Sequence, residues 1–502
     1  MQIQFVTGRN CWRVENARAV GIIIDGQDYF RALREACLKA RRHIIMVGWD
    51  FDFEIEMLPG ESDDQGRAAD GLPNAIGPFL DALADRSAGL DIYLLKWSGG
   101  ALIAPGRTLP AMKVKLLASD QVHLAFDGCH PIGACHHQKI VVIDDSLAFC
   151  GGIDATDGRW DTREHRSDDP RRAREGNPSP PWHDLTAVMS GPAAAALSEL
   201  ARKRWRRATD ADLEEEFRPG EDRWPGSIRA DFHDVPVAIA RTEPPATARP
   251  AITEIEQLYL DSIASARRVI YLESQYFTAG RIARAIARRL AESDGPEILI
   301  INPEAAHGLI EDRAMHVARS RLMRELAAQD RYGRLRFLYP VNGTGEPIYV
   351  HAKVCIVDDV LLRIGSSNLD RRSMAFDTEA DVALLARTDD DRARIAGLRD
   401  DLLAEHLGAD RETVARIMRQ TGSMFAVIDQ LNFRPRGLRP VPPREETLLS
   451  RWLADSKIFD PRYRGSASRR LGLTSRHVFI GAALVAGAGA LWLARRGRGR
   501  DR

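Results

Sequence analysis

The chain has 502 residues, of which 44% are hydrophobic and 28% are charged, so it has enough apolar material for two or three ordinary domains. Its 71 basic and 71 acidic residues balance to a formal net charge of zero, which argues against a protein that binds nucleic acid through its overall charge. The six cysteines are scattered without a CxxC pair, which favours a reducing compartment over a disulfide framework.

The order of elements along the chain is repeated. Each copy reads as a helix with apolar residues at helical spacing, a buried strand, a second strand and a segment that contains His and Lys. Four matching elements in the same order indicate two copies of one α/β unit. The matching pairs are 28–39 with 253–265, 40–51 with 266–277, 89–97 with 295–303, and 137–144 with 351–358.

Composition suggests where the copies begin and end. An Arg/Asp/Glu-rich stretch separates them, and a Pro/Arg-rich stretch follows the second copy. The insertion at 163–181 has the composition of a surface loop. We therefore expect a first half at 1–215, a linker at 216–250, a second half at 251–430, a Pro/Arg-rich linker at 431–470 and a tail at 471–502.

In the first copy, the sequence HHQKIVVID contains an apolar run typical of a strand that is buried on both faces. Side chains alternate along a strand, so His137 and Lys139 project to the same face. Asp144 has the opposite parity and falls at the strand end, where it is better placed to hold the turn or to meet a group behind the sheet. The second copy has the same order in His351, Lys353 and Asp358.

One His and one Lys from each copy suggest a single site with pseudo-twofold symmetry. Two lysines supply fixed positive charge for the oxygens of a phosphate. Two histidines can divide the work, one as a neutral nucleophile and the other as the acid for the leaving oxygen. This scheme cleaves a phosphodiester in two steps through a phosphohistidine, and it requires neither a metal nor a cofactor.

At these residues the sequence resembles the phospholipase D superfamily, whose pattern is H-x-K-x4-D-x6-G-S-x-N. The second copy fits at every position. The first copy has Gly152 in place of Ser and Asp154 in place of Asn. That variant, together with DGRWDTREH at 157–165 and YLESQYF at 271–277, is similar to the eukaryotic-type phospholipases D. The second-copy residues that carry the pattern are His351, Lys353, Asp358, Gly365, Ser366 and Asn368.

The resemblance implies a phospholipase D fold, in which two similar α/β sandwich halves pack with pseudo-twofold symmetry around one active site. It implies His137 as the nucleophile and His351 as the acid. A carboxylate on the following strand of each half is expected to orient the His ring, and those positions resemble Asp184 and Glu379. The further supporting residues implied are Asp154, Ser366, Asn368, Glu273 and Gln275. The implied reaction is headgroup cleavage of glycerophospholipids to phosphatidic acid, or transfer to an alcohol.

Near the C-terminus, residues 478–494 are uncharged and mainly apolar, with arginines on both sides. The segment is close to the lower limit of about 17 residues for a membrane span. We expect a C-terminal apolar helix that holds the protein at the cell membrane, with the catalytic region in the cytoplasm. The N-terminus lacks the pattern of a secretory signal, and the basic residues on both sides of the apolar segment do not settle its orientation. The expected partners are a phospholipid substrate and the membrane surface, without nucleic acid, and the chain is expected to be a monomer.

Other functions remain open at this point. A zinc site in CHPIGACHH (129–137) lacks the usual ligand spacing. A nuclease or tyrosyl-DNA phosphodiesterase of the same superfamily is a second alternative, although the latter type resembles H-K-N rather than H-K-D. A phosphatidyl-transferring synthase, such as a cardiolipin synthase, keeps both motifs but usually carries N-terminal spans. A non-enzymatic membrane scaffold predicts a broken motif, and both motifs are intact.

Overall fold

The structure is a computed structural model. It describes residues 3–99, 119–172, 179–215, 223–245, 250–305 and 309–444, together with residues 218, 447 and 460–461. The predicted apolar tail at 478–494 lies outside the described residues. Among the residues that are described, no helix is both long and apolar enough to cross a membrane.

The first half contains the helix at 28–39 and the three strands that the sequence pattern predicts, together with further strands and helices. Its elements are β1 (Arg13–Ile24), α1 (Asp25–Leu38), β2 (His43–Gly48), α2 (Ile76–Arg86), β3 (Asp91–Trp97), β4 (Val122–Asp127), β5 (Ile140–Ile143), β6 (Leu147–Gly151), a 3-10 turn (Pro170–Arg172), β7 (Trp182–His183), β8 (Leu185–Ser190) and α5 (Pro192–Thr209).

The second half repeats this order and adds helices after its last long strand. Its elements are β9 (Phe232–Glu243), β10 (Ile252–Thr253), α6 (Glu254–Ser265), β11 (Val269–Glu273), α7 (Gly280–Leu290), β12 (Glu297–Ile301), α8 (Leu309–Gln329), β13 (Leu335–Val341), β14 (Tyr349–Val350), β15 (Val354–Val357), β16 (Leu361–Gly365), α9 (Arg371–Ala375), β17 (Glu379–Leu385), α10 (Asp389–Leu407), α11 (Arg411–Thr421), α12 (Met424–Leu431) and β18 (Gly437–Pro440).

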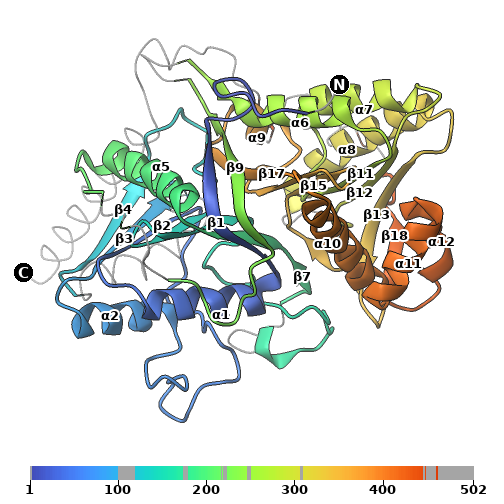
Figure 1. Ribbon diagram of the computed structural model, residues 1–502. Helices are drawn as coiled ribbons and strands as arrows, with labels where there is room; N and C mark the ends of the chain where they lie inside the picture. The colour runs from blue at the N-terminus through green and yellow to red at the C-terminus, as the bar shows by residue number, and fades with distance from the viewer. Residues whose placement is uncertain are drawn as a thin grey trace, which may run out of the picture.

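The order of strands in the large sheet has an internal symmetry. The centre is the antiparallel pair of β1 and β9 (Figure 1). Outward from β1 the order is β8, β6, β5, β2, β3 and β4, and outward from β9 it is β17, β16, β15, β11, β12 and β13, with β18 beyond. Each strand therefore has its counterpart at the same distance from the centre, which supports the α/β fold class with two similar halves.

The strand β9 corrects one expectation. Residues 216–250 were expected to be a linker, but residues Phe232–Glu243 of this range form β9, which pairs with both β1 and β17. The acidic and basic residues around it hide the short apolar run VPVAIA (235–240), whose side chains are mostly buried. The prediction was wrong here because composition was averaged over a range longer than the strand.

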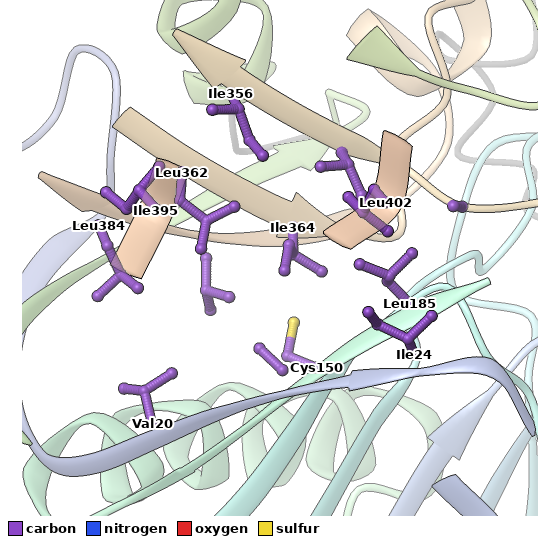
Figure 2. Close-up of a cluster of buried hydrophobic side chains, with 14 of the residues drawn as sticks. Val20, Ile24, Cys150, Leu185, Ile356, Leu362, Ile364, Leu384, Ile395 and Leu402 are labelled. Carbon is purple, nitrogen blue, oxygen red and sulfur yellow. The ribbon is translucent and has the colours of Figure 1, made fainter. Parts of the chain in front are cut away.

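A hydrophobic cluster joins the two halves. Val20, Ile24, Cys150 and Leu185 of the first half face Leu362 and its neighbours in the second half (Figure 2). Burying a side chain such as Leu or Ile stabilises the fold by about 1.5–3 kcal/mol. The halves therefore share one core and hold each other in a fixed relative position. The second-half members drawn in Figure 2 include Ile356, Leu362, Ile364, Leu384, Ile395 and Leu402.

The motif aspartates lie in tight turns at the strand ends opposite the motif histidines. Asp144 and Asp145 have positive φ values of 51° and 57°, and Asp358 and Asp359 have values of 54° and 58°. A hairpin turn with positive φ at both central positions favours Asp, Asn and Gly. The carboxylate of Asp144 accepts hydrogen bonds from the backbone N–H groups of residues 41, 42 and 43, and that of Asp358 accepts from residues 267, 268 and 269.

This geometry predicts that Asp144→Asn and Asp358→Asn each destabilise the fold. The Asn side chain tolerates the turn, but its amide NH2 would face a backbone donor, at a cost of about 1–3 kcal/mol. The loss should be larger for Asp144, which is fully buried and also pairs with Arg223 at 2.7 Å. Urea unfolding measures it, with the exposed Asp168→Asn as control. Unchanged stability combined with lost turnover would instead place these aspartates in the chemical step.

Candidate active site

The two motif histidines are held by backbone contacts that cross between the halves. His137 N–H donates to the carbonyl of Thr378 at 3.0 Å, and Thr378 N–H donates to Cys135 at 3.0 Å. In the second copy, β14 pairs with β7 in parallel, and His351 N–H donates to the carbonyl of His183 at 2.8 Å. The segment of His137 therefore runs beside the residues that precede β17, and the segment of His351 runs beside the residues that precede β8.

These contacts set which carboxylate meets which imidazole. His137 Nδ1 lies 2.9 Å from Glu379 Oε2, and His351 Nδ1 lies 2.7 Å from Asp184 Oδ2. Both carboxylates are fully buried. The two expected carboxylates thus contact the two imidazoles, and each one contacts the histidine of the other half. The periodicity of the sequence contains no information about this exchange, because it arises from packing between the halves.

The departure of the first copy from the family pattern has a steric cause. A Cβ on Gly152 would lie only 2.0 Å from Asp184 Oδ1, even before the hydroxyl of a Ser side chain is added. In the second half, the Ser366 hydroxyl donates to Glu379 Oε2 at 2.5 Å. The pair of Gly152 and Asp184 in the first half thus corresponds to the pair of Ser366 and Glu379 in the second half.

The motif lysines have different surroundings. Lys139 Nζ forms an ion pair with Asp154 Oδ2 at 3.1 Å and donates to the carbonyl of His137 at 2.9 Å. Lys353 Nζ donates to the carbonyl of His351. Burial, aided by the charge of the nearby Lys139, lowers the pKa of Lys353 to about 7 against the opposing charge of Asp184. A bound phosphate anion would raise this pKa again.

A third cation near the site was missed in the sequence. Arg159 lies over the ring of Trp182 at 4.1 Å, and that ring stacks on Tyr349 at 4.7 Å and lies 5.0 Å from His351. The charge of Arg159 lowers the pKa values of His351 and Lys353. Arg159 belongs to the segment DGRWDTREH, whose similarity to the family was noted without a role for this arginine.

The two imidazole–carboxylate pairs also differ electrostatically. Burial lowers the pKa values of His137 and His351 well below the usual range, and the two lysines add to this effect. Burial raises the pKa of Glu379 well above its usual value but that of Asp184 only to about 6, with Lys353 and Arg159 opposing the rise. Asp184 therefore ionises more readily than Glu379.

The remaining predicted residues divide into two groups. Asn368 Nδ2 contacts Gln275 Oε1 at 3.4 Å, and Gln275 donates to the Tyr349 hydroxyl at 2.9 Å, so both lie beside the site. Glu273 is fully buried and accepts from His183 at 2.9 Å and from His406 at 3.0 Å. It lies behind Asp184 in a separate cluster. The catalytic roles of all these residues stay predictions.

The zinc alternative at 129–137 gains no support from the geometry. Within the described part of the chain, the groups of His, Cys, Asp and Glu that are close enough to share an ion exclude every residue of that stretch. His136 instead lies 3.1 Å from Asp127, which pairs with Arg204.

The comparisons agree with this architecture. A family model described as "Cardiolipin synthase, PLD-like domain" matches residues 259–393. Phospholipase D A from Dictyostelium discoideum is 24% identical over 78% of this chain and 34% of its own length. Phospholipase D alpha 1 from Nicotiana tabacum is 24% identical over 76% of this chain and 64% of its own length. This chain therefore spans about a third to two thirds of the length of these curated relatives.

A solved structure shares the fold. The phosphatidylserine synthase from Haemophilus influenzae superposes with a TM-score of 0.54 and 13% identity, covering 83% of this chain and 96% of that one. A two-half α/β protein with paired His and Lys motifs is the class that these observations define. The matches to the family model and to the named phospholipases D support membership of the phospholipase D superfamily.

A substitution at Gly152 tests whether the space beside Asp184, rather than the match to the family pattern, determines activity. Gly152→Ser restores the family pattern, yet it should displace Asp184 and lower turnover of a soluble phosphodiester by about 100-fold or more. The matched Ser366→Gly variant loses the hydrogen bond to Glu379 and the one that Ser366 Oγ accepts from Ala380 N–H, about 1 kcal/mol each, and should retain more activity. Thermal unfolding checks that both variants are folded. Full activity of Gly152→Ser would show that the Asp184 position is not constrained in this way.

Proposed function

We propose that the protein is a phospholipase D-type phosphodiesterase that cleaves the headgroup of glycerophospholipids and releases phosphatidic acid. The observation that carries the proposal is the pair of imidazoles, each held at Nδ1 by a buried carboxylate of the other half. This arrangement leaves both Nε2 atoms for one phosphate, with the two motif lysines alongside. Fixed tautomers and fixed positive charge are what phosphoryl transfer requires.

The first step forms a bond between His137 Nε2 and phosphorus and breaks the bond to the headgroup oxygen, which takes a proton from His351. In the second step His351 accepts a proton from water, the water oxygen bonds to phosphorus, and the bond to His137 breaks. An alcohol in place of water gives a phosphatidyl alcohol. Two observations support this division. The His137 side chain is 16% exposed and that of His351 is 6% exposed. Asp184 ionises more readily than Glu379 and so better supports an imidazolium at His351.

The choice of a lipid substrate rests on the relatives. The curated proteins that match are named phospholipases D. The predicted apolar segment at 478–494 would bring the enzyme to a bilayer surface, and this part of the proposal depends on residues outside those that the structure describes. Monomeric state and membrane attachment remain part of the proposal.

A phosphatidyl-transferring synthase is the second candidate. The family model that matches residues 259–393 carries the description of a cardiolipin synthase. The two-step chemistry is the same in both cases, because a synthase replaces water with a lipid or amino-acid hydroxyl in the second step. The acceptor therefore distinguishes the two functions.

Product identification tests the proposal. The purified full chain is incubated with mixed phospholipid vesicles, with and without a primary alcohol, with phosphatidylglycerol and with serine. We expect phosphatidic acid in water and a phosphatidyl alcohol when alcohol is added. Products confined to cardiolipin or phosphatidylserine would favour the synthase. His137→Ala and His351→Ala should each abolish turnover, and near-normal activity of either folded variant would contradict the two-histidine mechanism.

The pH dependence of kcat/KM should be bell-shaped and should depend on Arg159. Asp184 acts as a carboxylate, so activity falls as pH drops through about 6. Lys353 acts as a cation, so activity falls as pH rises through about 7. Arg159 lowers both pKa values, so Arg159→Gln should move both limbs to higher pH. The exposed Arg392→Gln is the control; limbs that stay in place or move to lower pH would count against this assignment.

A further inference from the structure

A closed cluster of histidines and carboxylates lies directly behind Asp184. Its members are Asp25 at the start of α1, His165 in the loop before β7, His183 in β7 and Glu405 near the end of α10. Asp25 is 1% exposed, both histidines are fully buried and Glu405 is 7% exposed. The four side chains come from both halves of the molecule, and the proposed reaction uses none of them.

The nitrogen and oxygen atoms of this cluster face a common centre. His183 Nδ1 lies 3.0 Å from Asp25 Oδ1 and 2.9 Å from Glu405 Oε1. His165 Nε2 lies 3.1 Å from the same Glu405 oxygen and 3.5 Å from Asp25 Oδ2. Ligand atoms bound at about 2.0–2.2 Å in a tetrahedral site are roughly 3.3–3.5 Å apart. One observed separation, 3.5 Å, matches that spacing, and the other three, at 2.9–3.1 Å, are shorter by a few tenths of an ångström.

Hydrogen bonds alone leave part of the cluster unsatisfied. His183 Nδ1 and Asp25 Oδ2 are buried and make no hydrogen bond of good geometry, although carboxylate oxygens or a ring nitrogen lie within ion-pair distance of each. An imidazole nitrogen carries a single proton or a single lone pair, and here it points between two oxygens. A cation at that position can contact all of them at once. Leaving a buried polar atom without a partner costs about 1–3 kcal/mol.

The outer contacts are those that metal-bound histidines usually make. His165 Nδ1 lies 2.9 Å from Asp161 Oδ2, and His183 Nε2 lies 2.9 Å from Glu273 Oε2. A carboxylate on the second ring nitrogen fixes the tautomer and makes the first nitrogen a better ligand. Glu405 uses its other oxygen to accept from Arg163 at 2.6 Å, so only one of its oxygens faces the centre.

The excess of negative charge in the cluster also favours a bound cation. The carboxylates of Asp25, Asp161, Glu273 and Glu405 are all buried here, and the arginines paired with them are Arg163 and Arg172. The two paired arginines offset only part of these four negative charges, and Arg436 adds a further positive charge that acts on Asp25 and Glu405. Uncompensated negative charge is costly in a buried site, and a divalent cation or protons on the two imidazoles would reduce it.

We propose that this cluster binds one divalent transition-metal ion, with Asp25, His165, His183 and Glu405 as ligands. Two imidazoles with two carboxylates suit Zn²⁺ best, and the burial of all four side chains indicates a structural site. The ion fastens the two halves together behind the active site. It also positions Asp184, whose N–H donates to Asp25 Oδ1 at 3.1 Å and whose carbonyl accepts from Asp25 N–H at 2.8 Å. The inference does not depend on the proposed phospholipase activity.

Metal content is the direct test. The full chain, purified without a histidine tag, is dialysed against Zn²⁺, then against metal-free buffer, and measured by elemental mass spectrometry. We expect about one Zn²⁺ per chain, and a loss of at least about tenfold in His165→Gln and in Glu405→Gln. His136→Gln is the control, because His136 is a fully buried histidine beside a carboxylate outside this cluster. Wild-type protein without bound metal, or variants that keep their metal, would overturn the inference.

A second measurement covers variants that fail to fold. Anomalous diffraction at the zinc edge from crystals of the wild-type chain should give one peak between Asp25, His165, His183 and Glu405. Removal of the ion with a chelator should lower the thermal midpoint, and added Zn²⁺ should restore it. A peak elsewhere, or none, would show that the two imidazoles carry protons instead and that the cluster is an ion-pair network.

Discussion

The active site depends on two short backbone contacts between the halves, at residue 378 for one histidine and at His183 for the other. In each contact, the residue that accepts the hydrogen bond from the histidine N–H is followed in the chain by the carboxylate that meets the imidazole, and both belong to the opposite half. Neither half alone would have an oriented imidazole, since the ring nitrogen that must be fixed has its partner across the interface. The shared hydrophobic cluster of Figure 2 keeps these contacts in register. The packing of the two halves and the orientation of the catalytic imidazoles therefore depend on the same interface.

The pseudo-twofold symmetry is broken where the two histidines need different properties. Gly152 makes room for Asp184, whereas Ser366 bonds to Glu379. Lys139 faces Asp154, whereas its counterpart Lys353 has the neutral Asn368 at the matching motif position. Arg159 adds a charge beside Asp184 and has no arginine at the aligned position of the second copy. These differences make Asp184 the stronger acid, which suits a neighbouring histidine that must carry a proton during the proposed cycle.

Much of this was predictable from the sequence. The repeat placed α1, β2 and β3 against α6, β11 and β12 correctly, because apolar periodicity is a local property. Strand parity placed the motif aspartates in the turns, away from the histidines. The crossed pairing was not predictable, since it is set by packing between segments far apart in the chain. The strand β9 was missed because its charged neighbours masked a short apolar run.

The partners of Glu273 also could not be predicted from the sequence. Its position in a motif-like segment suggested a place beside the substrate, but its partners are His183 and His406. A buried carboxylate is positioned by whatever can satisfy it, and sequence does not reveal that partner. Of the cluster behind Asp184, only His165 and His183 lie in the motif-like segments 157–165 and 181–185, and Asp25 and Glu405 lie far from them in the chain, so the sequence has no spacing that is typical of a metal site.

A crystal structure of the full chain with bound tungstate tests the central claim most directly, because this oxyanion mimics the transferred phosphate. The account predicts one tungstate between the halves, within contact of Nε2 of both His137 and His351 and of both motif lysines, while each Nδ1 keeps its carboxylate from the opposite half. A tungstate held by the His and Lys of one half alone, or a ring turned so that Nδ1 faces the anion, would contradict it.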